Sequence, residues 1–145
     1  MNLKDIIARV LTRSHETVFR ATGGRVFGDA LGRPVVMLTT TGRKTGVPRT
    51  VMLTAPVHDA DAIVLVASYG GDDRDPAWFS NLVANPDVEV ITRGATRRMR
   101  ARIATAAERA ELWPRVIGAY SGYARYQERT ERVIPLVLLE PRPTA

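Results

Sequence analysis

The sequence predicts an α+β domain made mainly of β-strands, a small closed or nearly closed antiparallel barrel of about six strands with short helical insertions. Three observations favour this fold. Short β-rich runs recur from residue 35 onward, the helical stretches between them are short, and no regular βαβ alternation is present. The 145 residues, 45% of them apolar and 25% charged, fit one globular domain over residues 1–145. Closure of the barrel is favoured because it removes exposed strand edges.

Residues 1–33 are predicted to form an N-terminal helical segment. Apolar side chains recur there at helical spacing, basic and polar ones occupy the other face, and Gly23 and Gly24 end the helix. The apolar positions are Ile6, Ile7, Val10, Leu11, Val18 and Phe19. An amphipathic helix of this kind packs on the core of the domain or, in the alternative interpretation, lies against a membrane surface.

Six β-rich runs bounded by turn residues are predicted to be the strands. The first three indicate a meander of antiparallel strands, and the fourth and fifth indicate a hairpin across residues 93–95. The runs are Val35–Thr41, Val47–Val57, Ala62–Ser68, Val88–Thr92, Thr96–Ile103 and Ile134–Glu140.

Two short helices are predicted between the strands. Asp75 is a candidate N-cap with Pro76 at the first helical position, and this helix runs to Asn85. The segment 105–108 has the pattern of a capping box and opens the second helix. That helix is expected to end at a glycine, either Gly118 or Gly122.

The residue inventory excludes several classes of site. Cysteine is absent, and His15 and His58 are the only histidines. Disulfides, thiolate metal sites and cysteine nucleophiles are therefore excluded, and no metal is expected. A Ser-His-Asp triad would depend on one of two histidines in poor contexts, which disfavours a hydrolase. An ordinary dinucleotide-binding fold is also disfavoured, because the chain has no GxGxxG motif.

The chain is basic, with a formal charge of +6, and Lys4 and Lys44 are the only lysines among its 21 basic residues. This excess is typical of proteins that bind nucleic acid, anionic lipid or a polyanionic cofactor, and also of a plain solvated surface. No nucleic-acid partner is expected, because the aromatic residues do not alternate with arginine along one strand.

A cytoplasmic location is expected, because the N-terminus has no apolar signal region. The longest apolar run, Ala62–Ala67, is too short to span a bilayer. A peripheral contact of the N-terminal helix with the inner face of the membrane stays open, as does the oligomeric state.

The loop TTTGRKTGVPR at residues 39–49 carries the most informative pattern. Its two glycines permit a tight turn that exposes backbone N–H groups, and its threonines add hydroxyl donors. Arg43, Lys44 and Arg49 bring three cations to the same loop. The loop suits a phosphate or carboxylate group, although an ordinary hairpin with solvated charges explains the same pattern. It is not a Walker A loop, because the Gly-Lys-Ser/Thr ending is missing.

Two further stretches carry candidate ligand-binding residues. Residues 66–71 leave a strand through a serine and a glycine pair, and residues 75–82 begin a helix whose N-terminus favours anionic or carbonyl-rich ligands. Tyr120, Tyr123 and Tyr126 are spaced by three, so on one helical turn they share a face and offer rings for stacking and phenols for hydrogen bonds. Packing in the core explains the aromatic residues of both stretches equally well.

Four motifs, in this order, carry a resemblance to a known family. They are TTGRKTGVPR at residues 40–49, ASYGG at 67–71, PAWFSNLVANP at 76–86 and YSGYARYQ at 120–127, followed by an Ile-Pro pair at 134–135. Over roughly residues 35–141 the chain resembles the deazaflavin-dependent nitroreductase family of actinobacteria. The resemblance implies a split β-barrel like that of flavin-mononucleotide (FMN) oxidases. It also implies binding of the deazaflavin coenzyme F-420, whose phosphate and oligoglutamate tail match a basic loop.

The resemblance assigns coenzyme contacts to individual residues. The phosphate and the start of the tail fall to Arg43, Lys44, Thr45 and Arg49. The deazaflavin ring and its ribityl chain fall to Ala67, Ser68, Tyr69, Ala77, Trp78, Phe79, Ser80 and Asn81. Two positions depart from the family pattern, since Tyr69 stands where nitroreductase members carry a lysine and Phe79 replaces a tyrosine.

The reaction that the resemblance implies is hydride transfer from reduced F-420 to a flat, electron-poor acceptor, a quinone, enone or nitroaromatic. Tyr120, Tyr123 and Tyr126 wall the substrate site, with Tyr123 also beside the coenzyme ring. Tyr123, assisted by Ser68, is the candidate catalytic donor of a hydrogen bond or proton. Two alternatives stay open: an FMN-dependent or haem-degrading oxidoreductase of the same fold, and a non-catalytic F-420 carrier. The sequence does not separate enzyme from carrier, because hydride transfer needs no signature base.

Overall fold

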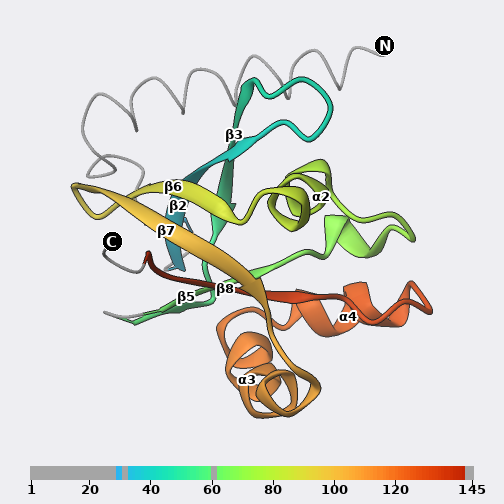
Figure 1. The fold of residues 1–145 in the computed structure, drawn as a ribbon. Helices are drawn as coiled ribbons and strands as arrows, with labels where there is room; N and C mark the ends of the chain where they lie inside the picture. The colour runs from blue at the N-terminus through green and yellow to red at the C-terminus, as the bar shows by residue number, and fades with distance from the viewer. Residues whose placement is uncertain (1–28, 31–32, 60–61, 143–145) are drawn as a thin grey trace, which may run out of the picture.

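The computed structural model describes residues 29–30, 33–59 and 62–142 (Figure 1). These residues form a curved antiparallel sheet with helices packed on it. The strands are β1 (Asp29–Ala30), β2 (Arg33–Thr41), β3 (Pro48–Thr54), β4 (Val57–His58), β5 (Ile63–Val66), β6 (Asp87–Thr92), β7 (Ala95–Ile103) and β8 (Leu136–Pro141). The helices are the 3-10 turn η1 (Tyr69–Gly71), α2 (Ala77–Ala84), α3 (Ala106–Ala119) and α4 (Gly122–Glu128).

The sheet has the strand order β1-β2-β6-β7-β8-β5-β4, and β3 pairs with β2. Neighbouring strands are antiparallel throughout. Within the described residues β3 and β4 are not paired with each other, so the sheet curves into a half-barrel rather than closing completely. The predicted α+β fold with a mainly antiparallel sheet is confirmed.

The predicted run Val47–Val57 is not one strand, because it breaks at Pro56. Proline lacks the N–H that a strand ladder needs, and just before it Ala55 donates its own N–H to the carbonyl of Pro34 at 2.8 Å. The piece before the break pairs with β2, and the piece after it pairs with β5. The predicted antiparallel pairing of the first three runs is thus confirmed, but the second run forms two strands rather than one. With this break and the short β1, the sheet has eight strands instead of six.

The predicted hairpin of β6 and β7 is confirmed, with a shorter turn than expected. Thr92 pairs directly with Ala95, which leaves Arg93 and Gly94 as the turn. Both turn residues have positive φ, 49° and 81° respectively, as a type I′ turn requires.

The predicted N-cap of α3 is confirmed, whereas the predicted N-cap of α2 is wrong. Pro76 itself is the N-cap of α2, and no side chain caps this helix. The expectation that Asp75 caps it is wrong, because the Asp75 carboxylate accepts a hydrogen bond from Arg132 Nη1 at 3.2 Å instead. In α3 the capping box is present: Thr105 Oγ1 accepts from the Glu108 N–H, and the Glu108 carboxylate accepts from the Thr105 N–H.

Helix α3 ends at Ala119, one residue beyond Gly118 and before Gly122. It continues through Pro114 and Gly118 to Ala119, and a single glycine inside a helix costs too little to stop it. Tyr120 is its C-cap. Gly122 opens α4, where a Cβ would overlap the ring of Tyr120. The expectation that Gly118 or Gly122 ends α3 is therefore wrong.

Strands β5 and β8 are buried on both faces and separate two apolar cores. Ile63 and Leu65 belong to the core that α2 fills, whereas Val64 and Val66 pack in the core beneath α3 and α4. Successive strand residues point to opposite faces, so each core receives every second residue. Burial on both faces explains why these strands are continuous apolar runs.

The predicted N-terminal helix lies outside the described residues, which begin at β1. The membrane contact that was the alternative interpretation of that helix therefore stays open. Among the helices that the structure describes, none is long and apolar enough to cross a membrane.

Candidate functional site

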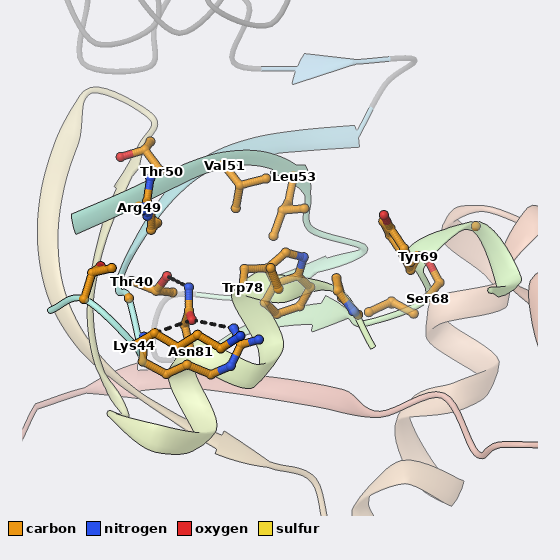
Figure 2. A pocket seen from close by; sticks show the side chains of 17 residues that line it. Thr40, Lys44, Arg49, Thr50, Val51, Leu53, Ser68, Tyr69, Trp78 and Asn81 are labelled. Atoms are coloured by element: carbon orange, nitrogen blue, oxygen red, sulfur yellow. Dashed lines mark hydrogen bonds between the residues drawn. The ribbon is translucent and has the colours of Figure 1, made fainter. Parts of the chain in front are cut away.

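A cavity of about 640 Å³ runs between β3 and α2 (Figure 2). Lys44 and Arg49 lie at one end, Ser68 and Tyr69 at the other, and Trp78 of α2 lies between the two ends. The remaining lining residues are Thr40, Gly42, Arg43, Thr45, Thr50, Val51, Leu53, Val66, Gly70, Pro76, Ala77 and Asn81. The cavity is thus cationic at one end and apolar along its length.

Backbone hydrogen bonds make the β2–β3 loop a tight turn. The Gly42 N–H donates to the Val47 carbonyl at 2.9 Å, and the Gly46 N–H donates to the Gly42 carbonyl at 2.8 Å. Gly46 has a φ of 71°, and a Cβ on Gly42 would lie 3.0 Å from the Val47 oxygen. Both glycines are therefore needed for the turn, and from it Arg43 and Lys44 extend as exposed side chains.

The amide of Asn81, 5% exposed, ties this loop to α2. Its Oδ1 accepts from the backbone N–H of Arg43 at 3.2 Å and from Arg43 Nη1 at 3.1 Å. Its Nδ2 donates to Thr40 Oγ1 at 3.3 Å (Figure 2). The buried Asn81 side chain thus positions both the backbone of the β2–β3 loop and the guanidinium of Arg43. Asn81 therefore anchors the cationic end of the cavity and also lines the cavity.

Val51 and Leu53 of β3 point toward the indole of Trp78 and form the apolar wall (Figure 2). Trp78 was among the residues predicted from the sequence, whereas Val51 and Leu53 were not. Arg49, Val51 and Leu53 are two positions apart and therefore share one face of β3. The strand period of two, counted from Arg49, is the signal that would have found them.

A second cavity, of about 330 Å³, adjoins the first. Four residues line both cavities and mark the junction between them: Leu53, Val66, Ser68 and Gly70. The second cavity is completed by Thr54, Tyr120, Tyr123 and Tyr126. All three predicted substrate-site tyrosines therefore meet at one place, next to the predicted coenzyme residue Ser68.

The tyrosines form an aromatic cluster with ring centroids 5.2 to 6.1 Å apart in edge-to-face or tilted contacts. They do not lie on one helical turn as the spacing of three predicted. Tyr120 is the C-cap of α3, whereas Tyr123 and Tyr126 belong to α4. The corner between the two helices brings the first ring onto the other two.

Each phenol of this cluster has a hydrogen-bond partner. The Tyr123 and Thr54 hydroxyls are 3.1 Å apart, and those of Tyr120 and Tyr126 are 3.3 Å apart. The hydrogen bond to Tyr120, followed by burial, raises the pKa of Tyr126, so this phenol is neutral at physiological pH. No local pattern could have indicated Thr54, because its partner lies 69 positions away.

The backbone at the junction between the cavities has three consecutive residues with positive φ. Tyr69, Gly70 and Gly71 have φ values of 46°, 64° and 86°, all in the left-handed region. Tyr69 is 54% exposed, with the Arg74 guanidinium carbon 5.6 Å from its ring centroid. Ser68 is 9% exposed, and its carbonyl accepts from the Gly71 N–H at 2.9 Å.

Ala67, Phe79 and Ser80 line neither of these two cavities. Ala67 and Phe79 are buried in the core that α2 fills, and Ser80 is half-buried on α2. Successive helix residues point about 100° apart, so Trp78 and Asn81 can face the cavity while the two residues between them cannot. Direct coenzyme contact of Ala67, Phe79 and Ser80 stays a prediction from the resemblance.

His58 is the one histidine in the described part of the chain, and it lines neither cavity. Its Nε2 lies 3.1 Å from Thr92 Oγ1, while its buried Nδ1 has no hydrogen-bond partner. Burial, and then the charge of Arg93, lower the pKa of His58, so the ring is neutral at physiological pH. The described residues also contain no group of three or more His, Asp or Glu side chains placed to hold a metal ion.

Comparisons with known proteins agree on one family. A family model described as F420H(2)-dependent quinone reductase matches residues 11–141. F420H(2)-dependent quinone reductase Rv1261c of Mycobacterium tuberculosis is 41% identical over 136 residues, which cover 91% of this chain and 91% of that protein.

Solved structures support the same assignment. An F420-H2 dependent reductase, FDR-A, has a TM-score of 0.68 at 39% identity and covers 74% of this chain and 95% of its own. A structure described as a domain-swapped dimer has a TM-score of 0.71 at 34% identity, over 96% of this chain and 100% of its own. The predicted resemblance to a deazaflavin-dependent reductase family is thereby confirmed. The chain belongs to the F420H(2)-dependent quinone reductase family.

Proposed function

We propose that the chain is an oxidoreductase that uses reduced coenzyme F-420 to transfer a hydride to a quinone. Enones and nitroaromatics are further flat acceptors that the same site admits. The observation that carries this proposal is the junction of two cavities at Ser68, one cationic and apolar, the other walled by tyrosines. A coenzyme in the first cavity and an acceptor in the second meet at this junction.

The two ends of the first cavity suit different parts of F-420, the cationic end its phosphate and tail and the apolar part its ring. Arg43, Lys44 and Arg49 would hold the phosphate and the start of the oligoglutamate tail through charge-assisted hydrogen bonds. Val51 and Trp78 offer flat apolar surface for the deazaflavin ring. The cavity volume lies in the 300–1,000 Å³ range that is typical of small-molecule sites.

Bound reduced F-420 supplies the hydride. The residues at the junction would then exclude water and hold the acceptor within the ~3–3.5 Å that a near-attack geometry needs. Tyr123 would donate a hydrogen bond where negative charge develops on the acceptor oxygen, with Thr54 orienting the phenol. Ser68 is a second donor at the junction.

Titration of the purified protein with oxidised F-420 and with FMN, followed by fluorescence, tests the coenzyme. We expect saturable binding of F-420 and much weaker binding of FMN. Mixing the protein loaded with reduced F-420 with menadione, a naphthoquinone, then separates an enzyme from a carrier, because a carrier binds F-420 without accelerating its reoxidation. Preference for FMN, or reoxidation no faster than in free solution, would contradict the proposal.

The affinity for F-420 is expected to rise with the number of glutamates on the coenzyme and to fall as salt is added. The reason is that exposed Arg43, Lys44 and Arg49 attract the anionic tail through solvent, where charges are screened beyond ~8 Å at physiological ionic strength. Fluorescence titrations with short-tailed and long-tailed coenzyme at several salt concentrations measure both effects. Equal, salt-independent affinities would exclude a basic track for the tail.

We further infer a cytoplasmic location with peripheral membrane contact through the N-terminal segment. Support comes from the amphipathic pattern of residues 1–33 and the basic charge of the chain. Sedimentation with vesicles of anionic or zwitterionic lipid tests it. We expect cosedimentation with the anionic vesicles only, and a protein that stays in the supernatant with both would contradict the inference.

A further inference from the structure

We propose that Arg132, which lines neither cavity, is a positioning residue that holds the junction between the two cavities in its reactive geometry. This inference deepens the proposed function and rests on it. Residue 132 lies in the connection between α4 and β8, far in sequence from every residue it holds. Neither its charge nor its spacing distinguishes it from the other arginines of the sequence.

The guanidinium of Arg132 binds a single segment, residues 67–75, at four points. Nε donates to the Asp72 carbonyl at 2.9 Å, and Nη2 donates to the carbonyls of Ala67 and Ser68 at 3.2 and 3.0 Å. Nη1 donates to Asp75 Oδ1 at 3.2 Å. The Arg132 side chain is only 18% exposed, so water competes little for its three bonds to backbone carbonyls, whereas the Asp75 carboxylate is 41% exposed.

The segment that Arg132 holds contains the left-handed residues Tyr69, Gly70 and Gly71. The left-handed conformation is sterically unfavourable for a tyrosine, so contacts with surrounding residues must maintain this conformation. Gly71 also packs so closely on α4 that a Cβ would lie 2.7 Å from the backbone carbonyl oxygen of Tyr126. Arg132 clamps the segment on both sides of this turn, through Ser68 before it and Asp72 after it.

Arg132 is itself fixed from α4, the helix that carries Tyr123 and Tyr126. Gln127 Nε2 donates to the Arg132 carbonyl at 2.7 Å, and Gln127 Oε1 accepts from the Ile134 N–H at 2.9 Å. The clamp therefore joins the tyrosine wall of the second cavity to the floor of the junction. Loss of the clamp would loosen this connection, although Arg129 Nη1 still donates to the Gly70 carbonyl at 3.2 Å and Thr130 Oγ1 to the Asp73 carboxylate at 2.8 Å.

The cationic end of the first cavity does not depend on Arg132, because Asn81 anchors it at the opposite end. Removal of Arg132 should therefore affect hydride transfer more than coenzyme affinity. Near-attack geometry is sensitive to displacements of about 1 Å, which can cost ~10²-fold in rate. Tail binding tolerates such displacements because it depends on exposed charges.

The matched control is Arg142, which makes bonds of the same kind and lines neither cavity. Its Nε donates to the Met99 carbonyl at 3.1 Å, its Nη2 donates to the Val88 carbonyl at 3.0 Å, and it lies 3.7 Å from the Asp87 carboxylate. Arg132→Ala thus removes three bonds to carbonyls and one ion pair, and Arg142→Ala removes two bonds to carbonyls and one ion pair. An effect that came only from lost stability would appear in both variants, whereas an effect of the clamp appears only in Arg132→Ala.

The experiment combines amide hydrogen exchange without coenzyme, F-420 affinity by fluorescence, and single-turnover reoxidation by menadione. For Arg132→Ala we expect faster exchange of the Gly71 and Asp72 amides, which bond to Ser68 and Tyr69 carbonyls in the parent. We also expect F-420 affinity within about threefold of the parent and reoxidation slowed by ~10- to 100-fold. Arg142→Ala should match the parent in all three measurements.

Two further measurements separate the geometry of the Arg132 guanidinium from its positive charge. Guanidinium ion at millimolar concentration should restore part of the rate of Arg132→Ala, because it can occupy the vacated fork. Arg132→Lys should stay slow, because one ammonium cannot bond the carbonyls and the carboxylate together. Full activity of Arg132→Lys, or equal losses in Arg132→Ala and Arg142→Ala, would overturn the proposal.

Failure of the proposed function gives a different result. In that case the parent protein itself neither binds F-420 nor reduces menadione. The amide hydrogen exchange measurement alone then decides whether Arg132 holds residues 67–75. Parental exchange at Gly71 and Asp72 in Arg132→Ala would exclude the clamp whatever the protein binds.

Discussion

Tyr123→Phe is expected to slow the reduction of quinones by ~10²–10³-fold while leaving F-420 affinity close to that of the parent. The ring of Tyr123 is 7% exposed and packs edge-to-face with Tyr120 and Tyr126, so phenylalanine can keep these contacts. Only the hydroxyl is lost, and with it the bond to Thr54 and the donor that faces the second cavity. Single-turnover reoxidation by menadione, beside a fluorescence titration, measures the two quantities separately.

Two further variants locate the origin of that effect. Tyr123→Ala should weaken both coenzyme binding and reoxidation, because it also opens the wall of the cavity. Thr54→Val keeps the phenol and removes its partner, so it should slow reoxidation less than Tyr123→Phe does. A parental rate for Tyr123→Phe with every acceptor would leave the phenol no chemical role. A parental rate for Tyr123→Ala as well would mean that the tyrosine cluster is not the acceptor site.

Lys44→Ala and Arg49→Ala are each expected to weaken F-420 binding by ten- to a hundredfold with the fold intact. Each removes a charge-assisted contact to an anion, for which ~1.5–3 kcal/mol is typical. Both side chains are exposed at the cationic end of the cavity, so their loss creates no buried gap. Fluorescence titration measures the affinity, and thermal unfolding checks the fold.

The matched control for these two variants is Arg98→Ala, which removes one exposed positive charge from β7, outside both cavities. It should lower the affinity little, because long-range attraction is screened by salt. Losses as large as those of Lys44→Ala would point to net charge rather than to contacts in the loop. Unchanged affinity in both loop variants would remove the β2–β3 loop from the coenzyme site.

The features that the sequence predicted correctly depend on neighbouring residues. The capping box from Thr105 to Glu108 spans four residues, and the turn after β6 is set by its own glycine. The cationic loop is likewise local, because two glycines and three cations lie within residues 42–49. Patterns of this length carry their own structural reason, so they can be identified without the rest of the chain.

The predictions from sequence are wrong where a residue distant in sequence binds a group that a local pattern assigns to a neighbour. Asp75 has the chemistry of an N-cap, but Arg132, 57 positions away, takes its carboxylate. The run Val47–Val57 looks continuous, but β2 pairs with one part of it and β5 with the other. Which partner is nearby is a property of the sheet topology, and local propensity contains no information about it.

The sequence by itself therefore determined the kinds of groups this protein carries: a basic glycine turn, an aromatic helix start and a tyrosine triad, and with them its family. Only the tertiary structure decided where these groups meet. The hydrogen bond between Thr54 and Tyr123 and the clamp of Arg132 on Ser68 join residues 69 and 64 positions apart. Such contacts arise only when the half-barrel brings the end of β3, the turn after β5 and α4 together, because burial of the two cores, rather than the contacting residues, drives that assembly.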